Sequence, residues 1–297
     1  MTGETRRADR SDLVPLESRN GRDSSKRFGL LYSPRTDEAQ QLARETESKL
    51  QALGVSTWSA SAGDECHVSR CAPESDMLIA FGGDGTIVRA ARLSAGSGVP
   101  ILGINFGRLG FLAELQPEQL LGELQALVSG QYRLEERMML HADLVRDGKT
   151  LRSFEALNDV VVSRGSMARV VRVDVHVDGQ YLANYVSDGI VVSTATGSTA
   201  YSLAAGGPVL DPCLRDILLT PIAPHLSIDR TLVLPDTAAV RLAVCAGYEA
   251  MCTVDGQVVE ALDDGDVVAV AASRHACRFV RMGEDNAPYR SLLEKLR

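Results

Sequence analysis

The sequence predicts an α/β amino-terminal half, Rossmann-like and built of βαβ units, followed by a mainly antiparallel β half. Between residues 28 and 129, short apolar runs alternate with segments of helical spacing, which is typical of an α/β layer. After about residue 130, apolar residues recur at every second position, as in strands with one buried face. The chain has 297 residues, 45% hydrophobic and 24% charged, so it can form two packed domains.

The first half contains two strongly periodic helices. Residues 28–32 predict an opening strand, and residues 37–53 then place apolar side chains on one side at helical spacing, with Gly54 as the C-cap. A second helix is predicted from Pro117, a residue favoured at the first helical position, to just before Gly130. The two apolar stripes are Ala39, Leu42, Ala43, Leu50 and Leu53, and Leu120, Leu121, Leu124, Leu127 and Val128.

A strand, turn, helix and strand lie between these two helices. Residues 77–81 form a short apolar run that predicts a buried strand, and this run ends in a cluster of glycines. Helical spacing resumes over residues 87–93, and residues 99–104 predict the next strand. This order predicts a βαβ unit with the glycines at its first turn.

The second half has the pattern of antiparallel strands. Valines alternate with polar residues over 171–177, and Asp178-Gly179 follows, a favoured two-residue hairpin turn. The same pair recurs between valine-rich segments, which predicts an antiparallel β domain. Residues 289–296 return to helical spacing. The other Asp-Gly pairs are Asp147-Gly148, Asp255-Gly256 and Asp264-Gly265.

Composition and charge exclude several classes of protein. The chain has 31 Lys and Arg against 39 Asp and Glu, and a net charge of −8 argues against a nucleic-acid partner. Apolar runs such as 78–81 and 190–192 are far shorter than the roughly 20 residues that span a bilayer, so we expect no membrane partner. Residues 1–26 have no apolar core after their arginines, which predicts a disordered polar tail rather than a secretory signal.

The cysteine pattern predicts a cytoplasmic location. Six cysteines in a chain of this length are too few to replace a core, and their spacings indicate no disulfide framework. Cys66, His67 and Cys71 could hold a metal ion, but no second Cys or His pair follows nearby. A plain loop is the simpler interpretation of these three residues.

The glycine cluster carries one carboxylate. Residues 81–86, FGGDGT, form the predicted strand-to-helix turn, where glycines let backbone amides approach a phosphate closely. Asp84 would repel a bound phosphate unless it takes a proton from an attacking hydroxyl or faces a metal ion. The alternative is a purely conformational Asp-Gly turn with a capping aspartate.

Residues 188–208 gather small hydroxyls and one aromatic ring around Gly197. Hydroxyls and amides can bind an adenine edge or a ribose, Tyr201 can stack or bind a phosphate, and small alanines leave room for a flat ring. The alternative is a Ser/Thr-rich loop whose hydroxyls cap the next helix. The residues concerned are Ser193, Thr194, Thr196, Ser198, Thr199, Tyr201 and Ser202, with Ala200, Ala204 and Ala205.

Two dipeptides elsewhere offer similar groups. Asn158 has an amide that can pair with adenine, and Asp159 can accept two ribose hydroxyls, although the pair could also be an ordinary turn. Asp188-Gly189 is ambiguous as well, because this dipeptide also marks hairpins.

The GGDGT turn resembles the one shared by NAD kinases, diacylglycerol kinases and sphingosine kinases, with a related form in phosphofructokinases. Residues 157–160, LNDV, resemble the NE/D motif of NAD kinases, and residues 188–208 are very similar to the long ligand-binding segment of that family. The resemblance covers about residues 28–297. Further similar motifs occur in the family's order at 107–112, at Arg137 with Leu140, at 220–225 and at 254–257.

The resemblance implies an NAD kinase, which transfers the γ-phosphate of ATP to the 2′-hydroxyl of the adenosine ribose of NAD. ATP is then the phosphoryl donor, NAD the substrate, and Mg²⁺ the divalent cofactor, with no protein ligand set predicted for the metal. Asp84 would accept the hydroxyl proton, while Gly83, Gly85 and Thr86 cradle the donor phosphates. The other implied contacts are Arg89, Phe111, Asn158, Asp159, Arg169, Val186, Asp188, Thr199, Ala200, Tyr201, Ser202, Leu203, Ala204, Ala223 and Gln257.

Three of these positions need comment. Asp159 stands where many relatives have glutamate, and Val186 stands where they often have a basic residue, so the contact at Val186 is expected to be lost or made by backbone alone. Arg169 matches a position for a basic or histidine contact, although a solvated charge beside the strand is the alternative.

The resemblance also implies the domain organisation and assembly. We expect a tail at 1–26, an α/β domain at 27–130, a β-rich NAD-binding domain at 131–275, and a segment at 276–297 that packs back on the α/β domain. Homodimers or homotetramers are expected. Two other functions stay open: a lipid kinase of the diacylglycerol kinase type, which would need an apolar acyl pocket, and a non-catalytic dinucleotide-binding sensor.

Overall fold

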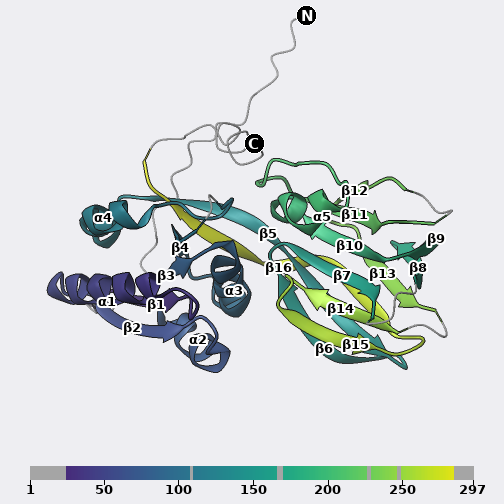
Figure 1. Cartoon of the computed structure of the whole chain (residues 1–297), viewed down its shortest axis with the longest axis horizontal. Coiled ribbons are helices and arrows are strands. Elements are labelled where there is room, and N and C mark those ends of the chain that lie inside the picture. Colours follow the sequence, from purple (N-terminus) through teal and green to yellow (C-terminus); the bar gives the residue numbers. More distant parts are fainter. Residues whose placement is uncertain (1–24, 108–109, 166–169, 226–228, 246–248, 284–297) are drawn as a thin grey trace, which may run out of the picture.

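The computed structural model of the chain describes residues 25–107, 110–165, 170–225, 229–245 and 249–283 (Figure 1). Most of the predicted tail, Arg169 and the helix predicted at 289–296 lie outside the described residues. No helix within the described ranges is long and apolar enough to cross a membrane.

The amino-terminal half is a three-layer α/β structure. Its parallel strands lie in the order β2-β1-β3-β4, with bounds Arg27–Tyr32 for β1, Ser56–Ser61 for β2, Met77–Gly82 for β3 and Ile101–Asn105 for β4. Helices α1 (Asp37–Ala52) and α4 (Pro117–Ser129) pack on one face, and α2 (Glu65–Cys71) and α3 (Asp84–Ser94) pack on the other. The predicted α/β layer and its βαβ unit are confirmed.

Left-handed glycines end the two periodic helices where the sequence predicts. Gly130 has φ +79° and caps α4, while Gly54 has φ +80° just after α1. The interpretation of Cys66, His67 and Cys71 as a plain loop is wrong, because they lie in α2, where the Asp64 carboxylate accepts the His67 amide at 3.2 Å. Among the described residues, no group of three or more His, Cys, Asp or Glu could hold a metal ion.

The second half consists of two facing layers of antiparallel strands. A six-stranded sheet in the order β12-β11-β10-β7-β14-β15 packs on the strands β6, β5, β16, β13, β8 and β9. The apolar core between them contains, for example, Val160, Val173, Ile190 and Val268. The bounds are β5 Arg133–Arg146, β6 Lys149–Ala156, β7 Asp159–Arg164, β8 Val171–Val177, β9 Gln180–Ser187, β10 Gly189–Thr194, β11 Asp216–Ile222, β12 Leu232–Pro235, β13 Val240–Val244, β14 Ala250–Val254, β15 Val258–Leu262 and β16 Val267–Arg281.

Three of the four predicted Asp-Gly turns close hairpins. Both residues have positive φ at Asp147-Gly148, Asp178-Gly179 and Asp255-Gly256, as a type I′ turn requires. At Asp264-Gly265 only the glycine has positive φ, and the turn joins β15 in one sheet to β16 in the other. Asp188-Gly189 likewise connects β9 to β10 across sheets, so it is not a hairpin.

Strands β5 and β16 run through both halves. They pair with each other along nearly their whole length, and Phe279 at the far end of β16 pairs in parallel with Ile101 of β4. The strand drawn in yellow in Figure 1 thus returns from the β-rich half to the α/β half. The predicted return of the chain to its first half is confirmed as far as residue 283, the last described residue, and one ten-stranded sheet joins the two halves.

Candidate active site

The glycine turn presents the open end of a helix. Strand β3 ends at Gly82, Gly83 is the N-cap of α3, and Asp84 is the first helical residue. A side-chain carbon added at Gly83 or Gly85 would meet no atom within 4 Å, so the backbone there faces open space. Because the first amides of a helix lack intrahelical partners, this turn can bind an anion such as a phosphate.

The Asp84 carboxylate does not cap its own helix. Its Oδ2 accepts the backbone N–H of Phe111 at 2.7 Å, and its Oδ1 accepts that of Leu112 at 3.3 Å. A side chain at Gly110 would overlap this carboxylate, so the neighbouring backbone lies directly against it. The structure therefore brings Asp84 and Phe111 together and holds the carboxylate between α3 and the 110–112 loop.

A pocket of about 320 Å³ opens in the β-rich half. Four predicted residues line it: Asn158, Asp159, Ala200 and Tyr201. Tyr201 is 45% exposed and forms part of its rim. The lining residues that sequence reasoning did not name as contacts are Val161, Ser163, Thr253, Asp255 and Gly256.

Two carboxylates lie at this pocket in different environments. Asp255 accepts the backbone N–H groups of Leu157, Asn158 and Asp159 at 2.9, 2.8 and 3.0 Å. Burial raises the pKa of Asp255, and these three hydrogen bonds offset only part of that rise. Asp159 is only 5% exposed, and burial together with the charge of Asp255 raises its pKa to about 7, against the backbone hydrogen bond from Tyr201. Both carboxylates at the pocket therefore have a raised pKa.

Close backbone packing joins the two predicted ligand segments. The Thr194 hydroxyl donates to the carbonyl of Leu157 at 2.6 Å and accepts the amide of Gly197 at 3.0 Å. A side chain at Gly197 would overlap the carbonyl of Asn158, so glycine is required there. These contacts bring Asn158-Asp159 beside Ala200 and Tyr201, which begin the short helix α5 (Tyr201–Ala204).

Most hydroxyls of the long segment bind within the protein rather than facing the pocket. Ser198 accepts the Leu210 amide at 3.0 Å, and the buried Ser202 hydroxyl lies 3.0 Å from that of Thr220. Thr199 donates to the carbonyl of Thr196 at 3.4 Å. These hydroxyls thus bind other parts of the protein, and the alternative in which they cap the next helix is not seen at α5, whose N-cap residue has no side-chain cap. Leu203 is partly buried and Ala204 is exposed, and neither lines the pocket.

Gln257 connects the pocket to the glycine turn. Its Nε2 donates to the carbonyl of Gly85 at 2.7 Å, and its Oε1 accepts from Arg89 Nε at 3.2 Å. Gln257 follows the hairpin turn at Asp255-Gly256, whose residues line the pocket. The contact therefore fixes the first turn of α3 against the pocket, although 168 positions separate Arg89 from Gln257.

Three other predicted residues lie at the opposite end of β10. Asp188 forms an ion pair with Arg164 at 3.3 Å, and its amide donates to the carbonyl of Ile222. The carbonyl of Val186 accepts the His225 amide at 2.7 Å, and Ala223 is an exposed residue with φ +43°. Strand β10 has six residues, Gly189–Thr194, and therefore spans about 20 Å between Asp188 and the end at which Thr194 binds the Leu157 carbonyl.

Comparisons with known proteins match both halves. Residues 26–132 match the family model of the ATP-NAD kinase N-terminal domain, and residues 157–282 match that of the ATP-NAD kinase C-terminal domain. The chain belongs to the ATP-NAD kinase family. Membership makes it an NAD kinase in activity, and neither a lipid kinase nor a non-catalytic sensor is supported.

The chain is similar in sequence or structure to individual NAD and NADH kinases over most of its length. The chain is 49% identical to NAD kinase of Moorella thermoacetica over 75% of this chain and 71% of the relative, and 39% identical to that of Dehalococcoides mccartyi over 92% and 96%. The crystal structure of yeast NADH kinase complexed with NADH aligns with a TM-score of 0.81 at 26% identity, over 92% of this chain and 88% of that one. An NAD kinase from Archaeoglobus fulgidus in complex with ATP aligns with a TM-score of 0.72 at 27% identity, over 91% and 98%.

Proposed function

We propose that the chain transfers the γ-phosphate of ATP to the 2′-hydroxyl of the adenosine ribose of NAD, giving NADP and ADP. The observation that carries this proposal is the Gln257 contact with Gly85 and Arg89, because it holds an anion-binding turn against a pocket lined by an amide, a carboxylate and an aromatic ring. A nucleoside in the pocket would place its ribose near the phosphates held by the turn.

The pocket would hold the adenosine part of NAD. The Asn158 amide can pair with adenine, and the Asp159 carboxylate can accept ribose hydroxyls. Ala200 leaves room for a flat ring, while Tyr201 offers a face for stacking and a hydroxyl for a phosphate. Asp188, with Val186 and Ala223 nearby, would meet the base at the other end of the dinucleotide.

Asp84 would act as the proton acceptor. The ribose 2′-oxygen attacks the γ-phosphorus, the bond from that phosphorus to the β–γ bridging oxygen breaks, ADP leaves, and the hydroxyl proton passes to Asp84. A carboxylate has about four acceptor positions, and the amides of Phe111 and Leu112 take two of them. The hydrogen bonds from the loop would thus orient the carboxylate and still leave it free acceptor positions for a proton. Gly83, Gly85 and Thr86 would hold the donor phosphates.

The turn also fits the divalent cation that the family implies. Mg²⁺ is usually bound by one or two carboxylates together with substrate phosphates, and Asp84 is a carboxylate at the phosphate-binding turn. When bound, the metal would neutralise charge on the phosphates during transfer.

Product analysis tests the activity directly. The purified chain with ATP, Mg²⁺ and NAD should form NADP, whereas NAD lacking the adenosine 2′-hydroxyl should bind and accept no phosphate. Phosphorylation of the deoxy analogue would refute the assigned position of transfer. Binding of NAD without any turnover would instead support the sensor.

Substitution of Asp84 tests the proton acceptor. Asp84→Asn should keep the fold and nucleotide binding but lower turnover at least roughly 100-fold. Asp178→Asn is a matched control, because Asp178 also accepts a backbone amide, that of Ala239 at 2.9 Å, in a hairpin outside the site. Near-normal turnover of the Asp84 variant would show that this carboxylate only holds the loop.

We also propose a cytoplasmic homodimer or homotetramer. All six cysteines are free thiols, which fits a reducing compartment. The β-rich half exposes large apolar side chains, including Leu151, Tyr181 and Val259, that a second copy could cover. Light scattering on the purified chain tests the assembly, and a monomeric mass at working concentration would contradict it.

A further inference from the structure

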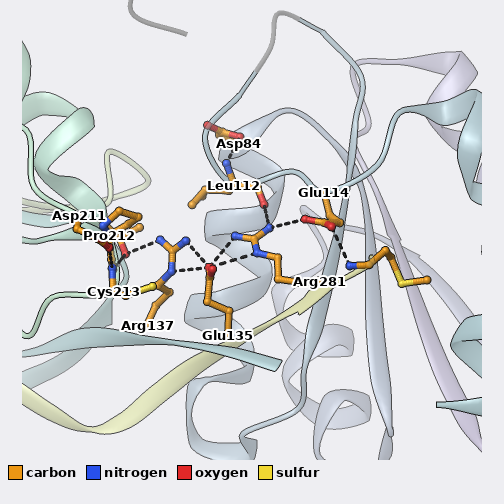
Figure 2. A network of polar contacts seen from close by, with 11 residues as sticks. Asp84, Leu112, Glu114, Glu135, Arg137, Asp211, Pro212, Cys213 and Arg281 are labelled. Atoms are coloured by element: carbon orange, nitrogen blue, oxygen red, sulfur yellow. Dashed lines mark hydrogen bonds and ion pairs between the residues drawn. The ribbon is translucent and has the colours of Figure 1, made fainter. Parts of the chain in front are cut away.

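Two buried arginines and one partly buried glutamate form a continuous cluster between the two parts of the site (Figure 2). Glu135 and Arg137 lie on β5, and Arg281 lies on β16. The Glu135 Oε1 accepts from Arg137 Nε at 2.8 Å and from Arg281 Nη2 at 2.9 Å. Both guanidinium groups also lie over the ring of Phe279, at 5.8 and 5.3 Å from its centre. We call these three charged residues the Arg281–Glu135–Arg137 cluster.

One end of the cluster reaches the loop that binds Asp84. Arg281 Nη1 donates to the carbonyl of Leu112 at 3.3 Å and to Glu114 Oε2 at 3.1 Å. The amide of the same Leu112 donates to Asp84 Oδ1. Figure 2 shows Leu112 between the Asp84 carboxylate and the Arg281 guanidinium. A single residue thus links Arg281 to the proposed proton acceptor.

The other end reaches the segment that forms the pocket. Arg137 Nη1 donates to the hydroxyl of Thr196 at 3.2 Å, and that hydroxyl lies 3.3 Å from the carbonyl of Pro212. Thr196 begins the 3₁₀ turn Thr196–Thr199, which leads directly into Ala200 and Tyr201 of the pocket. The cluster therefore contacts both the Asp84 loop and the nucleotide segment.

A contribution to folding stability does not explain why these charged residues are buried together. Arg137 is 4% exposed and Arg281 is 8% exposed, so both guanidinium groups lose most of their hydration on folding. Apolar residues of similar size often replace a buried charge cluster without loss of stability. Planar guanidinium groups, in contrast, hold several acceptors in a fixed geometry.

We propose that the Arg281–Glu135–Arg137 cluster positions the Asp84 carboxylate relative to the nucleotide pocket, with Arg281 acting through Leu112. Arg281 is thus a positioning residue that touches no substrate. This inference rests on the proposed function, in which Asp84 accepts the proton. Its consequence is that the two ends of the cluster affect different kinetic constants.

The first test replaces Arg281 by lysine, which keeps the charge but not the fixed fork of donors. Arg281→Lys should lower kcat at least roughly tenfold and change the KM for NAD less than about twofold, because only the Asp84 loop shifts. Arg146→Lys is the matched control, since Arg146 binds the fully buried Asp266 through two bonds of 2.8 Å and contacts neither the loop nor the pocket. The control should lose thermal stability with kcat unchanged.

The second test asks whether Arg281 acts through Asp84. In the Asp84→Asn background, Arg281→Lys should lower the remaining kcat by less than about twofold, because the group it positions is already lost. A full tenfold additional loss would overturn the proposal, and so would an unchanged kcat for Arg281→Lys in the wild-type background. Absence of NADP formation by the wild-type chain would instead refute the proposed function.

If Arg281→Lys does not fold, a variant of Arg137, at the end of the cluster that contacts Thr196, still tests the proposal. Arg137→Lys should raise the KM for NAD several-fold with a smaller effect on kcat, because it loosens the Thr196 turn. A change in melting temperature alone, with both constants unchanged, would show that the cluster is only structural.

Discussion

Replacing Asp159 by asparagine should stabilise the free protein above neutral pH. Asp159 is buried beside Asp255, and its pKa is raised from 3.8 to about 7 by burial and by that neighbouring charge. Asparagine has the size of the protonated side chain and can still accept the Tyr201 amide. We therefore expect Asp159→Asn to remove an unfavourable buried charge.

The sign follows from proton binding in the two states. Between the unfolded pKa of 3.8 and the folded pKa of about 7, the folded state binds more protons, so wild-type stability falls as pH rises and then levels off. The slope is at most about 1.4 kcal/mol per pH unit. The advantage of Asp159→Asn should thus grow by up to about 3 kcal/mol between pH 5 and pH 7. In domains of this size about 1 kcal/mol shifts Tm by 2–4 °C, so several degrees are expected.

Thermal or denaturant unfolding of wild type and variant at pH 5 and pH 8, without ligand, measures this difference. The control is Asp266→Asn, because the Arg146 guanidinium lowers the pKa of Asp266. Its contribution is complete above the unfolded pKa and is lost only in acid, so Asp266→Asn should destabilise the chain equally at both pH values. An Asp159→Asn difference that is the same at pH 5 and pH 8 would refute the raised pKa of Asp159.

Two further substitutions test the pocket. Asp159→Ala should weaken NAD binding roughly 10 to 150-fold in calorimetry, because hydrogen bonds to a charged acceptor contribute about 1.5–3 kcal/mol. The same variant should leave ATP affinity nearly unchanged. A selective loss of ATP affinity would place this residue at the donor site. Gly197→Ala should lower both Tm and NAD affinity, because the added carbon would overlap the backbone of Asn158. The control is Gly122→Ala on the exposed face of α4, where the added carbon has open space, and it should be neutral or stabilising in the same assays. Equal behaviour of the two glycine variants would contradict the packing argument.

The sequence predicts correctly those helices and strands whose local residue pattern favours the same structure as their packing in the fold. Helix α4 has Pro117 at its start and Gly130 at its end, and its apolar stripe faces the sheet, so local and tertiary signals coincide. Strand β2, Ser56–Ser61, has no apolar run, because it lies at the edge of the sheet, where two of its six residues are exposed and two are partly buried. Helix α2 is short and polar, and its capping by Asp64 is not distinguishable in sequence from a loop.

The site is predictable only where a motif contains it. Gly83, Asp84, Asn158 and Tyr201 lie in recognisable segments, whereas Asp255 has the pattern of an ordinary hairpin turn. In the structure that turn residue also binds three backbone amides under the pocket. Glu135 and Arg281 are 146 positions apart, and each lies near the end of a long strand. Strand pairing alone brings them together, so no local pattern could indicate their contact.

Strand β16 has a consequence for the order in which the protein can be completed during synthesis. It is the last strand of the chain among the described residues, yet it supplies Val268 and Val270 to the core between the β layers. It also supplies Phe279 to the core beneath α2 and α3, and Val280 to the core beneath α1 and α4. Each core therefore lacks an apolar member until residues 267–281 have been made. The half that is translated first therefore remains unfinished until residues 279 and 280 have been made.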